Sequence, residues 1–161
     1  MSFASLSLDH LAFPVFDVEK SLAFYGQVLG LPLVDAMSGD DWDGRRWLMM
    51  MLGLADQRQV VLVAFEGAKP PVMNLPKDAR HLAFSVKTDE ELAEWKHRLD
   101  GLGIAFTTED HGPQHSIYFD DPNGIVIEIT TPASRVTSLR PEIPPSRAVV
   151  ERFLAEHDPQ R

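Results

Sequence analysis

The sequence contains no cysteine, and this absence excludes several kinds of chemistry at once. Disulfide bridges, thiolate metal ligands and a thiol nucleophile are all ruled out, so a metal site in this chain must use histidine and oxygen donors. A chain of 161 residues buries enough apolar surface to fold without covalent cross-links. A cysteine-free chain suits a reducing compartment, and we expect the protein in the cytoplasm.

Long apolar runs and an excess of basic residues are also missing. No stretch approaches the ~18 apolar residues of a membrane-spanning helix, and the N-terminus lacks the basic-then-apolar pattern of a secretory signal. Acidic residues outnumber Lys and Arg by 24 to 15, which gives a formal net charge of -9. Such a surface repels a phosphate backbone, so we expect neither nucleic acid nor a membrane as a partner.

An internal repeat is the main feature that the chain does contain. The tetrapeptide His-Leu-Ala-Phe at 10–13 recurs at 81–84, an offset of 71 residues. After each copy come a valine at the same distance, a helix-like charged stretch and a Gly-Leu pair, at Gly30 and Gly101. Similarity at a long fixed offset is typical of a duplicated supersecondary unit, so the sequence predicts two equivalent modules.

The pattern within each module predicts one strand, one helix and then three strands. Alternating apolar residues indicate the strands, while Asp17 and the Thr88/Glu91 capping box mark the helix starts. The ranges expected for the first module are a strand at 8–15, a helix at 18–29, and strands at 31–36, 45–52 and 58–65, with turns at 38–41 and 54–56. Those for the second module are a strand at 80–86, a helix from 88 through 99, and strands at 104–108, 114–119 and 124–130.

The expected fold class is therefore α+β, built from two tandem βαβββ modules. We predict one domain over residues 1–132, with modules at about 6–66 and 80–132 joined by a Pro- and Gly-containing linker. The modules should form a cupped, mostly antiparallel eight-stranded sheet. Residues 133–161 fall outside the repeat and predict a C-terminal tail with a helix from 147 to about 157.

Three polar residues share one position in this pattern. His10, His81 and Glu128 all lie on the strand faces opposite the aliphatic rows, so a duplicated curved sheet can bring them together. Two neutral imidazoles and one carboxylate suit a divalent first-row metal ion, preferably Fe(II) or Mn(II), with Zn(II) or Ni(II) also compatible. A single histidine on a strand is more often structural, so the prediction depends on the three residues together.

These motifs resemble the vicinal oxygen chelate superfamily, which includes glyoxalase I, extradiol dioxygenases, fosfomycin-resistance enzymes, methylmalonyl-CoA epimerase and bleomycin-resistance proteins. The resemblance covers about residues 6–132. It implies paired βαβββ modules and a metal held by His10, His81 and Glu128. The segments that carry it are 9–13, 21–25, 81–84 and 116–128.

Departures from the superfamily pattern narrow the expected function. Glyoxalase I and the epimerase are expected to supply a fourth ligand near Leu62, where this chain is aliphatic, and a ligand triad is unneeded in a bleomycin-type binder. The fosfomycin transferases are expected to carry threonine where this chain has Ala12. We therefore expect a metal-dependent, dioxygenase-like enzyme acting on a small molecule that chelates through vicinal oxygens. A non-catalytic drug- or metabolite-binding protein and a fosfomycin-type thiol transferase remain the alternatives.

Candidate catalytic residues precede the last hairpin. The resemblance implies that a tyrosine ten residues before the glutamate ligand faces the metal, and Tyr118 has this spacing, although the sequence does not fix its facing. His111 and His115 are candidate general acids or bases. Because exposed sheet edges favour pairing and the superfamily commonly dimerises, we also expect a homodimer, with the tail from Pro141 onward covering part of an edge or site.

Overall fold

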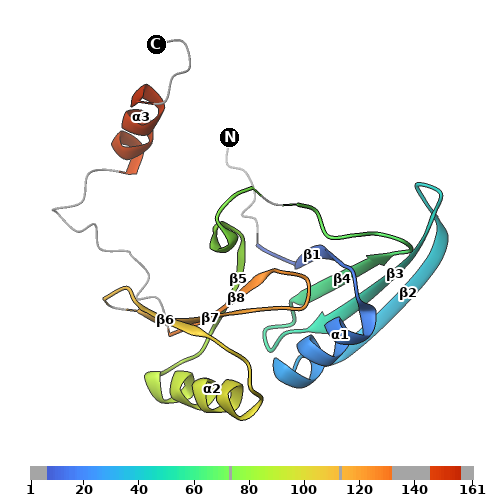
Figure 1. Cartoon of the computed structure of the whole chain (residues 1–161), viewed down its shortest axis with the longest axis horizontal. Helices are drawn as coiled ribbons and strands as arrows, with labels where there is room; N and C mark the ends of the chain where they lie inside the picture. The colour runs from blue at the N-terminus through green and yellow to red at the C-terminus, as the bar shows by residue number, and fades with distance from the viewer. Residues whose placement is uncertain (1–6, 73, 113, 132–145, 157–161) are drawn as a thin grey trace.

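The computed structural model describes residues 7–72, 74–112, 114–131 and 146–156. The chain runs through two modules of the same element order, followed by a separate C-terminal helix (Figure 1). The elements of the first module are β1 (His10–Val15), α1 (Val18–Ala23), the π-helix η1 (Phe24–Val28), β2 (Leu33–Trp42), β3 (Arg45–Gly53) and β4 (Gln59–Phe65). Those that follow are the 3-10 helix η2 (Lys77–Ala79), β5 (His81–Ser85), α2 (Asp89–Gly101), β6 (Thr107–Asp110), β7 (His115–Asp120), β8 (Val126–Thr130) and α3 (Ser146–Glu156).

The strands form two four-stranded mixed sheets, in the orders β1-β4-β3-β2 and β5-β8-β7-β6. Strand β1 pairs in parallel with β4, and β5 pairs in parallel with β8. The other strand pairs are antiparallel. The identical order confirms the tandem βαβββ modules that the repeat predicts. Among the described residues the eight strands are hydrogen-bonded as two separate sheets of four.

The helix starts follow their capping residues. The carboxylate of Asp17 accepts a hydrogen bond from the backbone N–H of Lys20, and the hydroxyl of Thr88 accepts one from the N–H of Glu91. The first helix then widens into η1, where the N–H of Leu29 donates to the carbonyl of Phe24, five residues earlier. Gly30, with φ of +74°, ends it in the left-handed region.

The expected turn at 38–41 is wrong, because these residues lie inside β2. Asp43 and Gly44 form the turn instead, with φ values of 54° and 69°. Positive φ at both central positions is the geometry that matches the twist of a two-residue hairpin. Position 39 of β2 favours glycine because a side chain there would collide with Trp47. An added Cβ would lie 2.9 Å from the Nε1 atom of Trp47.

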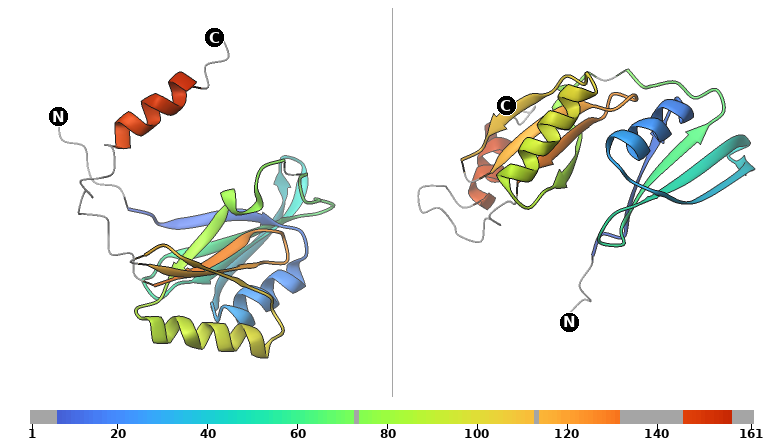
Figure 2. Two further views of the ribbon diagram at one scale, coloured as in Figure 1. Left: turned by 60° about the vertical axis from the view of Figure 1, so that its left-hand side comes forward. Right: turned by 90° about the horizontal axis from the view of Figure 1, so that it is seen from below.

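One hydrophobic core is shared by both modules. It combines the inner faces of β3 and β4 with those of β7 and β8, and helices α1 and α2 contribute to it from the same side of the molecule (Figure 2). Burial of these apolar side chains is the main contribution that holds the modules together. The fully buried members are Val15, Tyr25, Met50, Leu52, Val60, Leu62, Leu92, Leu99, Ile117, Ile127 and Ile129.

Polar contacts cross the seam between the modules beside this core. The buried hydroxyl of Tyr25 donates to Asp121 over 3.0 Å, and burial together with this carboxylate raises the pKa of the Tyr25 phenol. The side chain of Asn123 accepts from the N–H of Phe16 and donates to the hydroxyl of Ser21. The turn between β7 and β8 is therefore fixed to the start of α1.

The sheet faces that point away from the shared core differ in chemistry. On the first sheet the strand register places His10, Ala12, Val61, Val63, Met49, Met51 and Trp47 on this outer face. On the second sheet the outer face holds His81, Ser85, Glu128, Thr130, Ser116 and Tyr118. One outer face is thus mainly apolar, and the other is mainly polar.

The helix expected in the tail is present as α3, and it stands apart from both sheets in Figure 1 and in the left view of Figure 2. Residues 132–145, which include Pro141, lie outside the described part of the chain. Coverage of an edge or site by this tail therefore stays a prediction. Within the part of the chain that the structure describes, no helix is long and apolar enough to cross a membrane.

Candidate metal centre

Two of the three expected ligands lie side by side on the second sheet. His81 begins β5, and Glu128 lies on the neighbouring parallel strand β8, opposite Ala83. The Nε2 atom of His81 is 3.1 Å from the Oε2 atom of Glu128. The Glu128 side chain is only 9% exposed, while that of His81 is 40% exposed. A nearly buried carboxylate therefore meets an imidazole that opens toward solvent.

A hydrogen bond at the Nδ1 atom of His81 fixes the orientation of its Nε2 atom toward Glu128. Its Nδ1 atom lies 2.9 Å from the backbone carbonyl of Asp78 at the end of η2. A carbonyl only accepts, so Nδ1 carries a proton, and a neutral ring then has its lone pair on Nε2, the atom that faces Glu128. An Nδ1–H bonded to a backbone carbonyl is the usual arrangement behind a metal-binding histidine.

The two oxygens of Glu128 have different surroundings. Its Oε1 atom accepts hydrogen bonds from the hydroxyls of Ser116, at 2.7 Å, and Tyr118, at 2.9 Å. Its Oε2 atom is turned toward His81. The two hydroxyl groups hold the carboxylate in one orientation and compensate part of the cost of burying its charge. Oε2 and Nε2 of His81 thus form a pair of directed donors.

Tyr118 and His111 extend this network toward the surface. Tyr118 lies on the same face of β7 as Ser116, and its ring meets that of His81 edge to face. The Nε2 atom of His111 is 3.1 Å from the Tyr118 hydroxyl and 3.4 Å from a carboxylate oxygen of Glu109. Burial and the hydrogen bond to Glu128 raise the pKa of Tyr118 to about 12, so its phenol stays protonated near neutral pH.

His115 is not brought to this pair. It precedes Ser116 and projects from the opposite face of β7, where its Nδ1 atom lies 2.9 Å from Asp89 at the start of α2. This hydrogen bond, reinforced by the charge of Asp89, raises the pKa of His115. His115 therefore links β7 to the first residue of α2.

His10 also lies apart from the pair, on β1 of the first sheet. It is exposed, and its Nδ1 atom is 2.7 Å from the carboxylate of the adjacent Asp9. A carboxylate on Nδ1 directs the other ring nitrogen outward as a donor. Among the described residues of one chain, no three histidine or acidic side chains are close enough to hold a metal ion together. One chain therefore assembles two of the three expected ligands.

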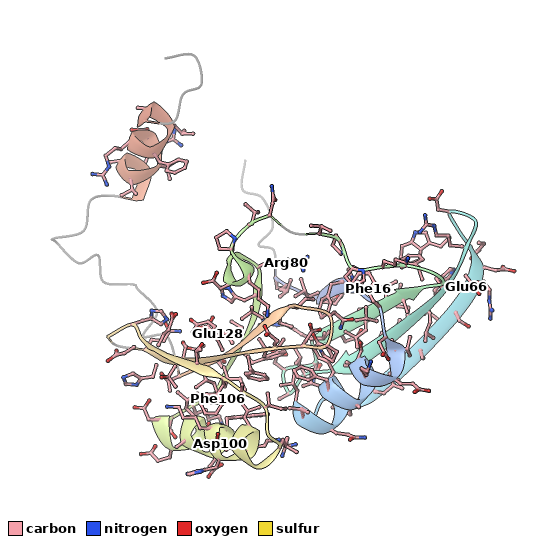
Figure 3. All side chains as sticks on the ribbon, viewed as in Figure 1. Phe16, Glu66, Arg80, Asp100, Phe106 and Glu128 are labelled. Atoms are coloured by element: carbon pink, nitrogen blue, oxygen red, sulfur yellow. The ribbon has the colours of Figure 1, made fainter. Side chains whose placement is uncertain are left out.

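A cavity of about 460 Å³ opens beside the pair. His81 and Tyr118 line it, together with the apolar residues Ala105, Phe106, Phe119 and Val126. Its charged lining residues are Lys77, Asp78, Glu109 and Asp120. Figure 3 marks Phe106 and Glu128 in this second module, with Glu66 at the far end of the first.

Ser116 and the charged residues of this cavity are not among the site residues predicted from the sequence. The signal for Ser116 was present, because it precedes Tyr118 by two residues in one strand and so must share its face. Lys77 and Asp78 carry no such signal. They reach the cavity only because η2 folds back beside β7, where the ammonium group of Lys77 pairs with Asp120.

The comparisons with known proteins agree with this architecture. The sequence profile of the Glyoxalase/Bleomycin resistance protein/Dioxygenase superfamily matches residues 7–129. The glutathione transferase FosA of Serratia marcescens is 27% identical over 130 residues, which is 76% of this chain and 79% of that protein. The metallothiol transferase FosB of Bacillus licheniformis is 29% identical over 131 residues, covering 78% of this chain and 75% of that protein.

Solved structures show the same fold. A glyoxylase/bleomycin resistance protein/dioxygenase domain from Frankia sp. superposes with a TM-score of 0.64 at 23% identity, over 81% of this chain and 98% of that one. A mutant of the fosfomycin resistance protein FosX from Listeria monocytogenes, complexed with Mn(II) and 1S,2S-dihydroxypropylphosphonic acid, gives a TM-score of 0.62 at 18% identity, over 81% and 96% of the two chains. From its repeated modules and the match over residues 7–129, the chain belongs to the Glyoxalase/Bleomycin resistance protein/Dioxygenase superfamily.

Proposed function

We propose that this protein is a metal-dependent enzyme whose metal site is divided between two copies of the chain. His81 and Glu128 of one copy supply two ligands, and His10 of a second copy supplies the third. The observation that carries the proposal is the 3.1 Å contact between Nε2 of His81 and Oε2 of Glu128, each held by hydrogen bonds from behind.

The donor set fits a divalent first-row ion. Two donor atoms that each lie about 2.1 Å from an ion, at roughly 90° to each other, are about 3.0 Å apart. With its proton on Nδ1, neutral His81 presents a lone pair to a carboxylate oxygen, and a shared cation relieves the repulsion between them. Two imidazoles with one carboxylate suit Fe(II) or Mn(II) best, with Zn(II) and Ni(II) as alternatives.

The two outer faces support a homodimer. His10 stands on a mainly apolar face, and the pair of His81 and Glu128 stands on a polar face to which the described residues of the same chain add no third ligand. When the apolar face of one copy covers the polar face of another, His10 completes the triad and the half-buried Trp47, Met49 and Met51 leave water. A two-fold axis then creates two equivalent sites.

The substrate that suits this site is a small molecule with two neighbouring oxygens. A divalent ion with one carboxylate ligand keeps a net positive charge and, when bound, supplies Lewis acidity to a chelating diolate. Tyr118 is positioned to donate or accept a hydrogen bond at an oxygen beside Glu128, since its hydroxyl already contacts that carboxylate. His111, in contact with the Tyr118 hydroxyl, connects this position to solvent for proton movement.

Dioxygenase-like oxidation of a catechol is the first reaction that we propose. Protein reconstituted anaerobically with Fe(II) should consume dioxygen with catechols and open the ring, as followed by an oxygen electrode and absorbance. The Glu128→Ala variant, treated identically, is the control, because it lacks the only anionic ligand. Stoichiometric metal without turnover on any diol would instead favour a non-catalytic drug- or metabolite-binding protein.

A second candidate reaction is thiol transfer to an epoxide such as fosfomycin. The observation that favours it is the 27% and 29% identity to FosA and FosB, which are named as transferases. Ala12 argues against it, because the superfamily resemblance predicts threonine at this position in the transferases. Resistance conferred on a fosfomycin-sensitive host, and thiol consumption by the Mn(II)-loaded protein, would decide for this reaction.

A further inference from the structure

We propose that this site selects chelating substrates whose remaining part is apolar and either neutral or positively charged, and rejects those with a second anionic group. The inference rests on the proposed metal site and adds the substrate class. It comes from the charges that line the cavity beside His81 and from the chemistry of the outer face that carries His10.

The cavity wall is negatively charged. Its described lining contains three carboxylates, those of Asp78, Glu109 and Asp120, but only one ammonium group, that of Lys77. Lys77 is already paired with Asp120, so its charge is not free to meet a ligand anion. An anionic substituent placed here would approach two further carboxylates without a compensating cation.

The apolar part of the wall defines the size and character of the substrate. Ala105 and Val126 lie next to His81 and Tyr118, while Phe106 and Phe119, which also line the cavity, belong to the shared core. A cavity of about 460 Å³ accommodates a single aromatic ring with a short side chain. A ring chelated at the metal through two oxygens would extend along this lining. Its far substituent would then lie among the carboxylates.

The face that supplies His10 adds no cation close to the metal. His10 pairs with Gln59, and the next residues on this face along β1 and β4 are Ala12, Val61 and Val63, with methionines of β3 beyond them. The cation on this face of β3 is Arg45. The residue of β3 nearest to His10 is Gly53, because it pairs with Gln59, which in turn pairs with His10. Arg45 is eight residues from Gly53. At ~3.4 Å per residue, Arg45 is about 27 Å along the strand and outside direct contact with a small ligand.

A matched pair of ligands tests the inference. 4-(2-Aminoethyl)catechol and 3-(3,4-dihydroxyphenyl)propanoate share the chelating ring and carry short side chains of opposite charge. Isothermal titration into the Mn(II)-loaded protein, without dioxygen and at low ionic strength, should give at least about tenfold tighter binding of the amine. Added salt should reduce this ratio, because the interaction is partly exposed.

Charge variants assign the effect to the cavity. Glu109→Gln should lower the amine-to-carboxylate ratio about threefold, and Lys77→Gln should raise it, because Asp120 then loses its partner. Glu94→Gln removes the same charge from the exposed surface of α2 and should leave the ratio unchanged. A ratio that responds equally to Glu109→Gln and Glu94→Gln would contradict the assignment to this cavity.

Metal uptake, measured without any ligand, distinguishes a wrong substrate class from a wrong metal site. If Mn(II) binds but both catechols bind equally well, or the carboxylate binds more tightly, the substrate class is wrong and the metal site stands. If no divalent ion binds to the full-length protein, the proposed function fails, and this inference fails with it.

Discussion

Removing one hydroxyl group from the seam between the modules should destabilise the protein by about 2 kcal/mol. Tyr25 is fully buried, and its hydroxyl donates to Asp121, whose carboxylate also accepts from the N–H groups of Asn123 and Ile125. A hydrogen bond to a charged group contributes about 1.5–3 kcal/mol. Tyr25→Phe keeps the ring packed against its neighbours, so the effect is confined to this bond.

The assay is reversible urea unfolding at one fixed protein concentration, since the proposed dimer would make stability concentration-dependent. For a chain of this size, about 2 kcal/mol corresponds to roughly 4–8 °C in melting temperature. The sequence offers a matched control, because it contains only two tyrosines. Tyr118→Phe should change stability less, since Tyr118 is only partly buried, but should alter metal affinity. A Tyr25→Phe protein within about 0.5 kcal/mol of the parent would refute the role given to the seam.

Three other perturbations have distinct expected results. Glu128→Gln should keep the fold and weaken metal affinity, and Glu128→Ala should weaken it by more than about 100-fold, as measured by competition with a chromophoric chelator; unchanged affinity would remove Glu128 from the ligand set. Asp89→Asn should lower the pKa of His115, which can be measured by NMR. Because Asp89 raises this pKa in the folded state, it stabilises the fold below pH ~6.5, and this stabilisation is lost as the pH rises through the folded pKa. The variant should therefore lose stability mainly at low pH. Gly30→Ala places a side chain at φ +74° and should destabilise by about 1–2 kcal/mol in thermal unfolding, with no effect on metal binding.

Local signals in the sequence predicted much of the fold because they act over a few residues. The caps at Asp17 and Thr88 and the strand alternation correspond to real helix starts and strands. The predicted turn at 38–41 does not form because pairing with β3 outweighs the turn preference of Gly and Asp, and the Asp43-Gly44 pair forms the hairpin turn instead.

The candidate site depended on information that one sequence does not contain. Strand parity was enough to give His81 and Glu128 a common face. It could not show that the shared core separates the face of His10 from theirs, because this depends on how the two modules pack. The facing of Tyr118 was equally undetermined, since one residue of register in the preceding turn reverses it.

Mixing two inactive variants tests the divided metal site most directly. His10→Ala and Glu128→Ala are each expected to fold, checked by circular dichroism, and to bind little metal. In a mixed dimer, His10 of the Glu128→Ala chain meets His81 and Glu128 of the His10→Ala chain, so one of the two sites is complete.

The measurement is stoichiometric Mn(II) content after the two variants are co-refolded in equal amounts. Random pairing makes about half of the dimers mixed, so we expect roughly one quarter of the parent's metal content. Each variant refolded alone should show almost none. A mixture that binds no more metal than the separate variants would contradict a site built from two chains.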